Sequence, residues 1–396
     1  MDLGTLLDVL RPLVLILALA GCGNPPSPNV VVDDEPFLSL VETLGGADTV
    51  GYARAMETRD FDFPGDHGPH EDFRTEWWYV TGNLDAEDGR ELGFQFTIFR
   101  SSLAPTPPGG PSIWSTNQAY MGHFAVTDIT NEDFRAVELF SRGGGGLAGA
   151  RAEPFEVWLE DWRLEGLSND VAFPMRLTAD GDGVNLDLIL ESGKPYVLQG
   201  DSGLSQKGRE PGNASYYYAH TRMPTRGRVQ IDEDHLEVSG LAWLDREWST
   251  SALSDGQVGW DWFALQLSDG WDLMVYQLRR EDGSPDPLSD GVLISPEGRR
   301  VPLEWGRGVL VEPTQTWLSP VDDAEYPSGW RIRVPEQELD LTVTPALPDQ
   351  ELRVAFRYWE GSVRVSGKGS GGNEVSGRGY VELTGYAGPS LQDGAK

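Results

Sequence analysis

The sequence has very little cysteine and few basic residues. Cys22 is the single cysteine among 396 residues, so no disulfide can form within the chain. Lysine and arginine number 31 against 63 aspartate and glutamate residues, which gives a formal net charge of −32. Binding to nucleic acid depends on cationic side chains at the phosphates, so no nucleic-acid partner is expected. Stability must come from packing.

Familiar catalytic motifs are also missing from the sequence. There is no Gly-x-Ser-x-Gly elbow of a serine hydrolase and no Walker-type phosphate loop. The run Gly143 to Gly146 is followed by neither a lysine nor a helical pattern, so we interpret it as a flexible loop. We therefore expect neither serine-hydrolase nor nucleotide chemistry, and nothing in the sequence requires a cofactor.

The N-terminal segment has the pattern of an export signal. The apolar run LRPLVLILALAGC, residues 10–22, is too short to span a membrane, and it ends in Leu19-Ala20-Gly21-Cys22. Small residues before a cysteine resemble the bacterial lipobox, where the thiol is acylated. We expect residues 1–22 to be a lipoprotein signal peptide, with Cys22 lipidated and anchored in the membrane. Gly23 favours the outer membrane, with the protein facing the periplasm; an ordinary signal peptide with a chance cysteine is the alternative.

The rest of the chain indicates a tether followed by β structure. Residues 23–72 are predicted to be a Pro-rich tether and a short helical or loop segment, with helical spacing over residues 37–56. Beyond the tether, short runs of alternating apolar and polar residues are separated by Gly, Asp and Pro turns. This pattern predicts an all-β fold of antiparallel strands.

A weak internal repeat suggests two copies of one β unit. Residues 77–96 align with residues 260–278: both begin with aromatic-x-aromatic, and both continue through a leucine (Leu84, Leu267) to an Asp-Gly turn. We therefore predict a first domain over residues 73–250 and a second over residues 251–390.

Strand alternation places the aromatic residues of each copy on defined faces. Trp78 shares a face with Glu76, and Trp77 shares the opposite face with Tyr79. In the second copy Trp260 and Trp262 point together. We expect these rings to line or close the apolar inside of a barrel.

Four stretches carry a resemblance to a known family: "FPGDHGPHEDFRTEWWYVTGNL", "YYYAHTRMPTRGRV", "SGLAWLDREWS" and "VGWDWFALQLSDGWDLMVYQL". They resemble the AttH-like and carotenoid hydratase-like lipoproteins, often described as predicted secreted hydrolases, over roughly Phe63 to Tyr386. The resemblance implies two lipocalin-like antiparallel β-barrels in tandem. Relatives are frequently encoded beside export-type ABC transporter permeases, so it also implies such a permease as a partner.

One branch of that family hydrates the terminal double bond of acyclic carotenoids. The resemblance implies an acid that protonates carbon and aromatic faces that support the resulting cation. Asp245 and Trp248 match an Asp-His-x-Trp pattern of this branch, but Arg246 replaces the histidine. Leu278, two residues after Tyr276, stands where the branch has an aspartate. These two departures argue against hydratase activity.

The candidate site residues follow from these patterns. We consider four residues as acid–base candidates: Glu76, His220, Asp245 and Glu247. We consider nine as ligand-binding candidates: Trp77, Trp78, Tyr79, Tyr216, Tyr218, Arg246, Trp248, Trp260 and Trp262. His67 and His70 are weak candidates for a metal, and a barrel-entry loop is the alternative reading of their stretch. Arg246 and Asp245 have a structural alternative, in which they pair to close the end of a barrel over a tryptophan.

Three functions remain open from the sequence. The leading hypothesis is a membrane-anchored lipocalin-like protein that binds or transfers an apolar lipid or isoprenoid ligand inside a barrel. The second is a hydratase-like lyase that adds water to an isoprenoid double bond. The third is an interaction protein that docks on an ABC permease.

Overall fold

The computed structural model describes residues 49–168, 171–251 and 253–387. The chain divides into two units, residues 1–35 and 36–396, and everything described below belongs to the second. The predictions for the signal peptide, Cys22 and most of the helical segment over residues 37–56 lie outside the described residues. The all-β prediction is confirmed, with three short 3-10 turns at Gly65–His67, Gly144–Gly146 and Pro335–Gln337.

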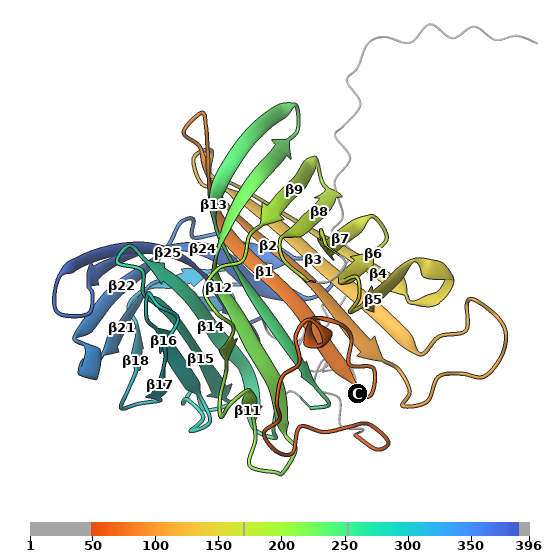
Figure 1. Ribbon diagram of the computed structural model, residues 1–396. Helices are drawn as coiled ribbons and strands as arrows, with labels where there is room; N and C mark the ends of the chain where they lie inside the picture. Colours follow the sequence, from red (N-terminus) through yellow and green to blue (C-terminus); the bar gives the residue numbers. More distant parts are fainter. Residues whose placement is uncertain (1–48, 169–170, 252, 388–396) are drawn as a thin grey trace, which may run out of the picture. The chain divides into compact units, whose positions relative to one another are not determined.

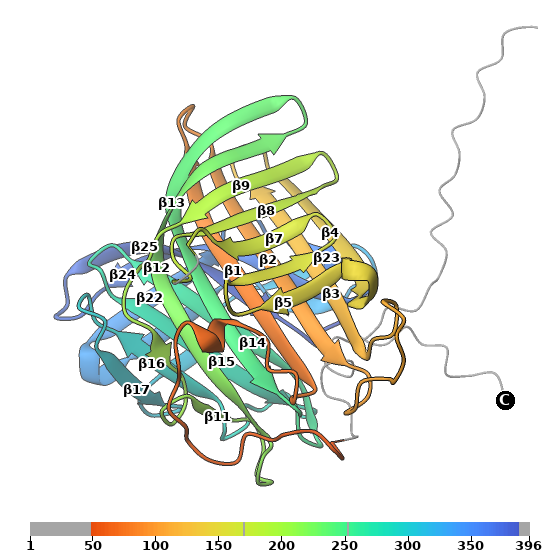
Figure 2. The same ribbon diagram turned by 45° about the vertical axis from the view of Figure 1, so that its right-hand side comes forward.

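The first sheet has 13 strands and is a nearly closed barrel. Its main path runs β4-β3-β2-β1-β13-β12-β9-β8-β7-β6-β5, and β10 and β11 pair with β12. Figures 1 and 2 show β5 to β9 folded back across β1 to β3, which brings the sheet close to closure. The strands are β1 (Thr75–Ala86), β2 (Glu91–Ser102), β3 (Gln118–Asp128), β4 (Asp133–Arg142), β5 (Ala148–Arg151), β6 (Glu156–Leu159), β7 (Trp162–Gly166), β8 (Met175–Gly181), β9 (Val184–Leu190), β10 (Val197–Leu198), β11 (Leu204–Gln206), β12 (Ala214–Ile231) and β13 (Asp234–Ser249).

The second sheet has 10 strands and curls into a half-barrel. Its path runs β17-β16-β15-β14-β25-β24-β22-β21-β18, β23 pairs with β24, and β19 and β20 form a separate hairpin. The strands are β14 (Gln257–Leu267), β15 (Asp272–Arg280), β16 (Asp290–Ile294), β17 (Arg300–Glu304), β18 (Leu310–Pro313), β19 (Thr316–Leu318), β20 (Glu325–Pro327), β21 (Trp330–Val334), β22 (Leu339–Pro345), β23 (Glu351–Arg353), β24 (Arg357–Lys368) and β25 (Glu374–Leu383).

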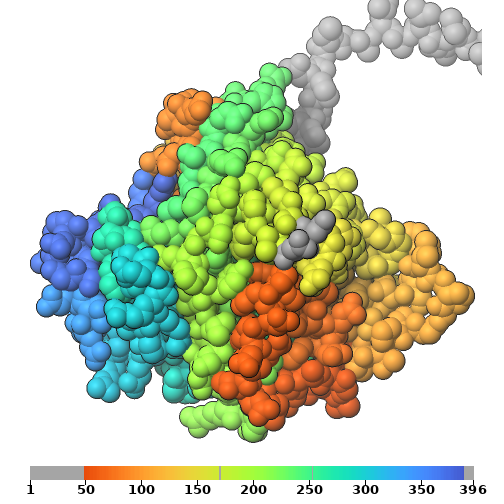
Figure 3. Space-filling view, in the orientation of Figure 1, coloured from red at the N-terminus to blue at the C-terminus, as the bar shows by residue number. Residues whose placement is uncertain are grey.

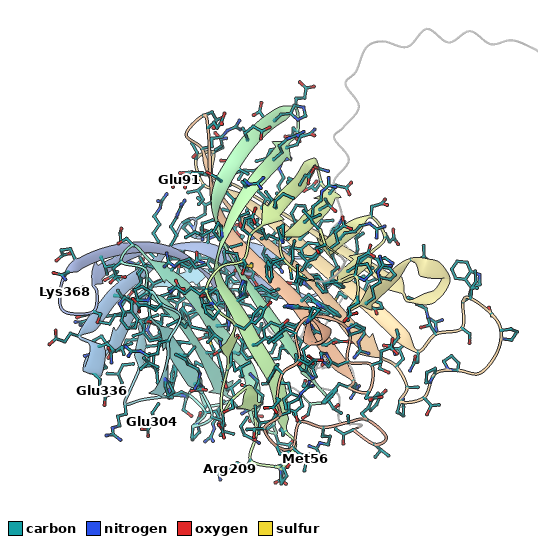
Figure 4. The ribbon with its side chains drawn as sticks, viewed as in Figure 1. Met56, Glu91, Arg209, Glu304, Glu336 and Lys368 are labelled. Carbon is teal, nitrogen blue, oxygen red and sulfur yellow. The ribbon has the colours of Figure 1, made fainter. Side chains whose placement is uncertain are left out.

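Each sheet encloses its own apolar core. Val80, Phe94 and Leu186 are fully buried inside the first sheet, and Phe263 and Ile332 are fully buried inside the second. Period-2 alternation produces these cores, because every second residue of a strand points to the same face. Charged residues gather at turns and strand ends, as the labelled Glu304, Glu336 and Lys368 in Figure 4 illustrate.

The two sheets pack against each other through their outer faces. A third apolar cluster joins Tyr79 and Trp243 of the first sheet to Trp262 and Tyr276 of the second. The rings of Tyr79 and Trp262 meet edge to face, with centroids 5.1 Å apart. Polar contacts reinforce this interface: the Asn83 side chain donates to the Gly379 carbonyl at 3.1 Å.

The predicted face sharing is confirmed, but the predicted position of the rings is corrected. Trp78 points into the first barrel with Glu76, whereas Trp77 and Tyr79 point outward toward the second sheet. Trp260 and Trp262 likewise face the first sheet. The repeated aromatic pairs therefore belong to the interface between the sheets, because alternation defines which residues share a face but not what covers it.

The two hairpins of the predicted repeat have matching turns. Gly89 and Gly270 both have positive φ, of 92° and 89°, and each donates its N–H to the residue three positions earlier at 3.0 Å. Aligned on these glycines, Leu84 corresponds to Leu265, two residues before the Leu267 with which the sequence alignment paired it.

A bulge divides β12 into two parts. Between His220 and Met223 the strand has one more residue than β13, and Arg222 there has a φ of 54°. Before the bulge Tyr217 faces the second sheet, and after it Met223 lies in the core of the first barrel. The extra residue reverses the faces to which odd and even positions point. One strand therefore serves the interface with its first half and the barrel core with its second.

Residues 49–74 lie across the first sheet beside β12, as red in Figure 3 shows against green. The Tyr216 hydroxyl donates to the Glu57 carbonyl at 2.9 Å, and the ring of Phe61 packs on Trp248. Among the described residues, no helix is long and apolar enough to cross a membrane.

Candidate functional site

A pocket lies between the two sheets, with a cavity of about 80 Å³. Such a cavity has room for about three water molecules or part of a small organic molecule. Its walls combine seven aromatic rings with three carboxyl groups and one lysine. The lining residues are Trp77, Tyr79, Phe99, Lys207, Tyr217, Asp245, Glu247, Ser249, Ser251, Leu253, Trp260, Trp262, Tyr276, Leu278 and Glu382.

Asp245 is held in the pocket wall by two donors. It lies on β13, whose alternation turns Asp245 and Glu247 toward the second sheet and Arg246 into the first barrel. The Tyr217 hydroxyl donates to Asp245 Oδ2 at 2.7 Å, and the Trp243 indole N–H donates to Oδ1 at 2.8 Å. Both donors are buried, so the carboxyl has a single orientation.

Burial raises the pKa of Asp245 to about 8. The hydrogen bonds from Tyr217 and Trp243 and the charge of Lys207 lower this pKa in part, while the charge of Glu247 raises it further. A carboxyl with this pKa carries its proton at neutral pH and can serve as a general acid.

Glu382 is a second carboxyl with a raised pKa in the same pocket. The Trp260 indole N–H donates to its Oε2 at 2.8 Å. Burial raises the pKa of Glu382 to about 7, and the charge of Glu247 contributes to the rise. Near neutral pH this group is close to half ionised, so it can accept a proton as well as donate one.

Lys207 and Glu247 form an ion pair at the pocket wall, with Nζ 3.2 Å from Oε1. The ammonium also lies over the ring of Tyr276, 4.2 Å from its centroid. Burial lowers the pKa of Lys207, but the charge and hydrogen bond of Glu247 together with the nearby Tyr276 and Asp290 outweigh that effect, so the pKa of the lysine is raised. Lys207 therefore stays positively charged.

Glu360 lies behind the pocket wall and contacts it through Tyr79. This carboxyl on β24 is fully buried, and its Oε1 accepts a hydrogen bond from the Tyr79 hydroxyl at 2.6 Å. Its other oxygen has no hydrogen-bond partner among the described residues. Burial and the nearby Glu382 raise the pKa of Glu360 well above its usual range, so the group is neutral.

The structure brings six of the sequence-predicted residues together in this pocket. They come from three strands, β1, β13 and β14, and from both predicted domains: Trp77, Tyr79, Asp245, Glu247, Trp260 and Trp262. Leu278, one of the two departures from the hydratase pattern, also lines the pocket. The other departure, Arg246, does not.

Glu76 and Arg246 lie inside the first barrel, away from the pocket. The fully buried Glu76 carboxylate pairs with both Arg246 and Arg100. The Arg246 guanidinium also lies 4.0 Å from the Trp78 ring centroid and 5.3 Å from that of Trp248. The expected arginine over tryptophan is present, but its carboxylate partner is Glu76 and not Asp245.

Tyr216, Tyr218 and His220 also lie outside the pocket. They share the predicted face of β12, which packs under residues 49–74 and β10. Burial lowers the pKa of His220 to about 4, and its Nε2 accepts the backbone N–H of Gly193 at 2.9 Å. A neutral imidazole so placed is a packing element of this end of the barrel.

His67 and His70 bond to protein groups instead of converging on a metal position. His67 contacts the hydroxyls of Tyr218 and Tyr196, while His70 stacks on Trp248 with ring centroids 3.7 Å apart. Within the described part of the chain, no group of three His, Cys, Asp or Glu residues is arranged to hold a metal ion.

Sequence reasoning missed several residues of the pocket. Lys207 comes from the segment after β11, Glu382 from β25, and Tyr217 from the odd face of β12. Tyr217 could have been predicted, since it stands between Tyr216 and Tyr218 and alternation places it on the outward face of the strand. Lys207 and Glu382 could not, because only the docking of the two sheets brings them near Asp245.

Comparisons with known proteins agree with this architecture. A family model described as AttH-like matches residues 54–386. The crystal structure of an AttH protein from Nitrosomonas europaea is 34% identical, with a TM-score of 0.74, over 85% of this chain and 100% of that chain. Kievitone hydratase from Nectria haematococca shares the fold at 15% identity and a TM-score of 0.64, over 84% of this chain and 97% of that chain.

One curated relative shares sequence with the chain. The dehydratase asqC of Emericella nidulans is 21% identical over 236 residues, which are 56% of this chain and 64% of that relative. The chain thus spans less than two thirds of the length of this relative.

Proposed function

The chain belongs to the AttH-like family, and from that membership and its pocket we propose that it adds water to, or removes water from, an apolar unsaturated molecule bound between its two sheets. One observation carries this proposal. Asp245 is a carboxyl with a pKa raised to about 8, oriented by two donors, in the wall of an aromatic pocket. Kievitone hydratase and the dehydratase asqC are similar proteins whose names describe water addition and removal.

In the direction of hydration, the Asp245 carboxyl donates its proton to one carbon of the double bond. The π electron pair forms the new C–H bond, and the other carbon becomes cationic. Trp77, Trp260 and Trp262 line the cavity and can support that cation, because an aromatic face attracts positive charge.

Water then attacks the cation and loses one proton to a carboxylate. Glu382 suits this step, because its pKa near 7 leaves much of it ionised at neutral pH. The new C–O bond uses an electron pair of the water, and exchange with solvent removes the proton from Glu382 and returns one to Asp245. Elimination of water from an alcohol is the same path in reverse.

The experiment uses the full chain with acyclic carotenoids and shorter isoprenoids in deuterium oxide. The expected product carries one carbon-bound deuterium and one new hydroxyl group, detected by mass spectrometry. The Asp245→Asn variant should form it at least about a hundredfold more slowly, while Asp255→Asn, an exposed control position in the β13–β14 loop, should match the parent chain. Absence of deuterium from every probe, with binding retained, would show that the pocket does not transfer protons.

Binding without chemistry is the second candidate, and the apolar walls of the pocket favour it. The chain would then carry an apolar lipid or isoprenoid between the sheets, and not within a barrel as the sequence suggested. Mass spectrometry of molecules that copurify with the full chain tests this candidate, and a Trp262→Ala variant should lose them.

The lipobox and the family resemblance support two further proposals. The protein is anchored in the outer membrane through Cys22 and faces the periplasm, and an ABC permease is its partner.

A further inference from the structure

The loop between β2 and β3, residues 103–117, exposes three large apolar side chains. Leu103 is 62% exposed, Ile113 is 72% exposed and Trp114 is 61% exposed. The loop keeps a defined conformation: Leu103 donates its backbone N–H to the Asn117 carbonyl at 2.7 Å, and the Asn117 side chain donates to the Ala104 carbonyl at 2.6 Å. The exposed apolar side chains therefore belong to a loop that is held by hydrogen bonds.

This loop is free of charge in a strongly acidic chain. Residues 101–127 contain no Asp, Glu, Lys or Arg, although charged residues make up 24% of the sequence and its net charge is −32. The acidic surface elsewhere repels an anionic membrane, whereas an uncharged loop can approach it. Proline, serine and threonine supply most of the remaining residues.

The loop lies beside Gly51 and Tyr52, at the start of the described part of the chain. The Tyr52 hydroxyl donates to the Ser102 carbonyl at 2.8 Å, and a Cβ placed on Gly51 would lie 2.9 Å from Cγ of Pro105. The preceding residues include the apolar run that ends at Cys22. Lipid attached to Cys22, which the lipobox predicts, would tether the chain to the membrane at the end of the described part that adjoins this loop.

We propose that the 103–117 loop contacts the membrane directly, with Leu103, Ile113 and Trp114 entering the interfacial layer of the bilayer. A tryptophan with a partly packed ring is suited to this layer, because its indole is apolar with one polar N–H. Three apolar side chains bind lipid weakly alone, and a second membrane attachment makes the contact stable. The absence of charge across the loop favours lipid over a protein partner, which charged side chains would specify.

The test places a fluorescent label on the loop in the full chain. Ser112→Cys is labelled with an environment-sensitive dye, and the parent chain, whose single cysteine is Cys22, gives the background labelling. The protein is reconstituted into protein-free vesicles of phosphatidylethanolamine and phosphatidylglycerol that contain nitroxide-labelled lipid. We expect the Ser112 label to be quenched at least about threefold more strongly than a control label.

The matched control is Val321→Cys in the turn between β19 and β20. Val321 is 47% exposed and its neighbour Leu318 is 56% exposed, but Asp322 and Asp323 adjoin it. Adding I113S and W114S to the Ser112→Cys chain should abolish the difference in quenching, with the unfolding midpoint unchanged because both side chains are exposed. Equal quenching at the two positions overturns the proposal. So does protection of the Ser112 label in native membranes but not in protein-free vesicles, which would indicate a protein partner.

Discussion

The Tyr217 hydroxyl donates to Asp245 across 2.7 Å, and the same hydroxyl accepts the Trp262 indole N–H at 3.2 Å. The first contact lies within the first sheet, and the second crosses to the other sheet. The orientation of the proposed acid therefore depends on how the two sheets dock. A change confined to the second sheet can alter the acid without touching it.

Replacement of Asp245 by asparagine tests the acid directly. The asparagine side chain has the same size and still offers one oxygen to accept a hydrogen bond, but it has no acidic proton to donate. We expect turnover to fall by about a hundredfold to ten-thousandfold, with binding of the same probe largely retained. The measurement is the initial rate of deuterium incorporation beside equilibrium binding. A variant with parental rates would remove Asp245 from the mechanism.

The raised pKa of Asp245 also predicts how stability depends on pH. The folded chain keeps this proton up to about pH 8, whereas the unfolded chain releases it near pH 3.9. Between these values the folded chain binds more protons, so rising pH favours unfolding by up to about 1.4 kcal/mol per pH unit from this group. Urea unfolding across the window measures the effect. As pH rises, Asp245→Asn should become steadily more stable relative to the parent. A difference in unfolding free energy that does not change with pH would contradict the raised pKa.

Glu76→Gln should be one of the most destabilising conservative changes in the chain. It removes the carboxylate that neutralises two buried guanidinium groups, those of Arg100 and Arg246. An unpaired buried charge costs about 3 to 5 kcal/mol of unfolding free energy. Glu87→Gln, at an exposed turn, is the control and should change stability by less than about 0.5 kcal/mol. Chemical denaturation compares the three proteins.

Isosteric replacements of Glu360 and Tyr79 should lower the unfolding free energy by different amounts. Burial keeps Glu360 protonated, so Glu360→Gln replaces one neutral group by another and should cost about 1 kcal/mol or less. Tyr79→Phe removes the donor at 2.6 Å and leaves the buried carboxyl without it, so we expect a loss of about 1 to 3 kcal/mol. Thermal and urea unfolding at neutral pH measure both, and a larger loss in Glu360→Gln would show that this carboxyl is ionised.

The strands and their faces could be predicted from the sequence because they are local properties. Alternation correctly grouped Trp77 with Tyr79 and Trp260 with Trp262, and the Asp-Gly pairs located both hairpin turns. The same alternation excludes a side-by-side pair of Asp245 and Arg246, since consecutive residues of a strand point to opposite faces. The expected pairing of these two residues overlooked that rule.

The position of the pocket could not be predicted, because it depends on which faces dock. An aromatic face fits a barrel interior and a sheet interface equally well in sequence. The partner of Arg246 is 170 residues away at Glu76, and Glu382 reaches Asp245's pocket from the last strand. Contacts at such separations leave no periodic signal in the chain.

The bulge at Thr221 and Arg222 has a consequence for how β12 tolerates changes in length. Because His220 pairs with Leu244 and Met223 with Ala242, which share one face of β13, losing either residue would restore regular pairing and leave the other side chains of β12 on their present faces. A deletion at another position within β12 would instead move the side chains on one side of it to the opposite face. Deletion scanning along this strand should therefore find the least damage at these two residues, where only their own contacts, such as those to Asp272, are lost.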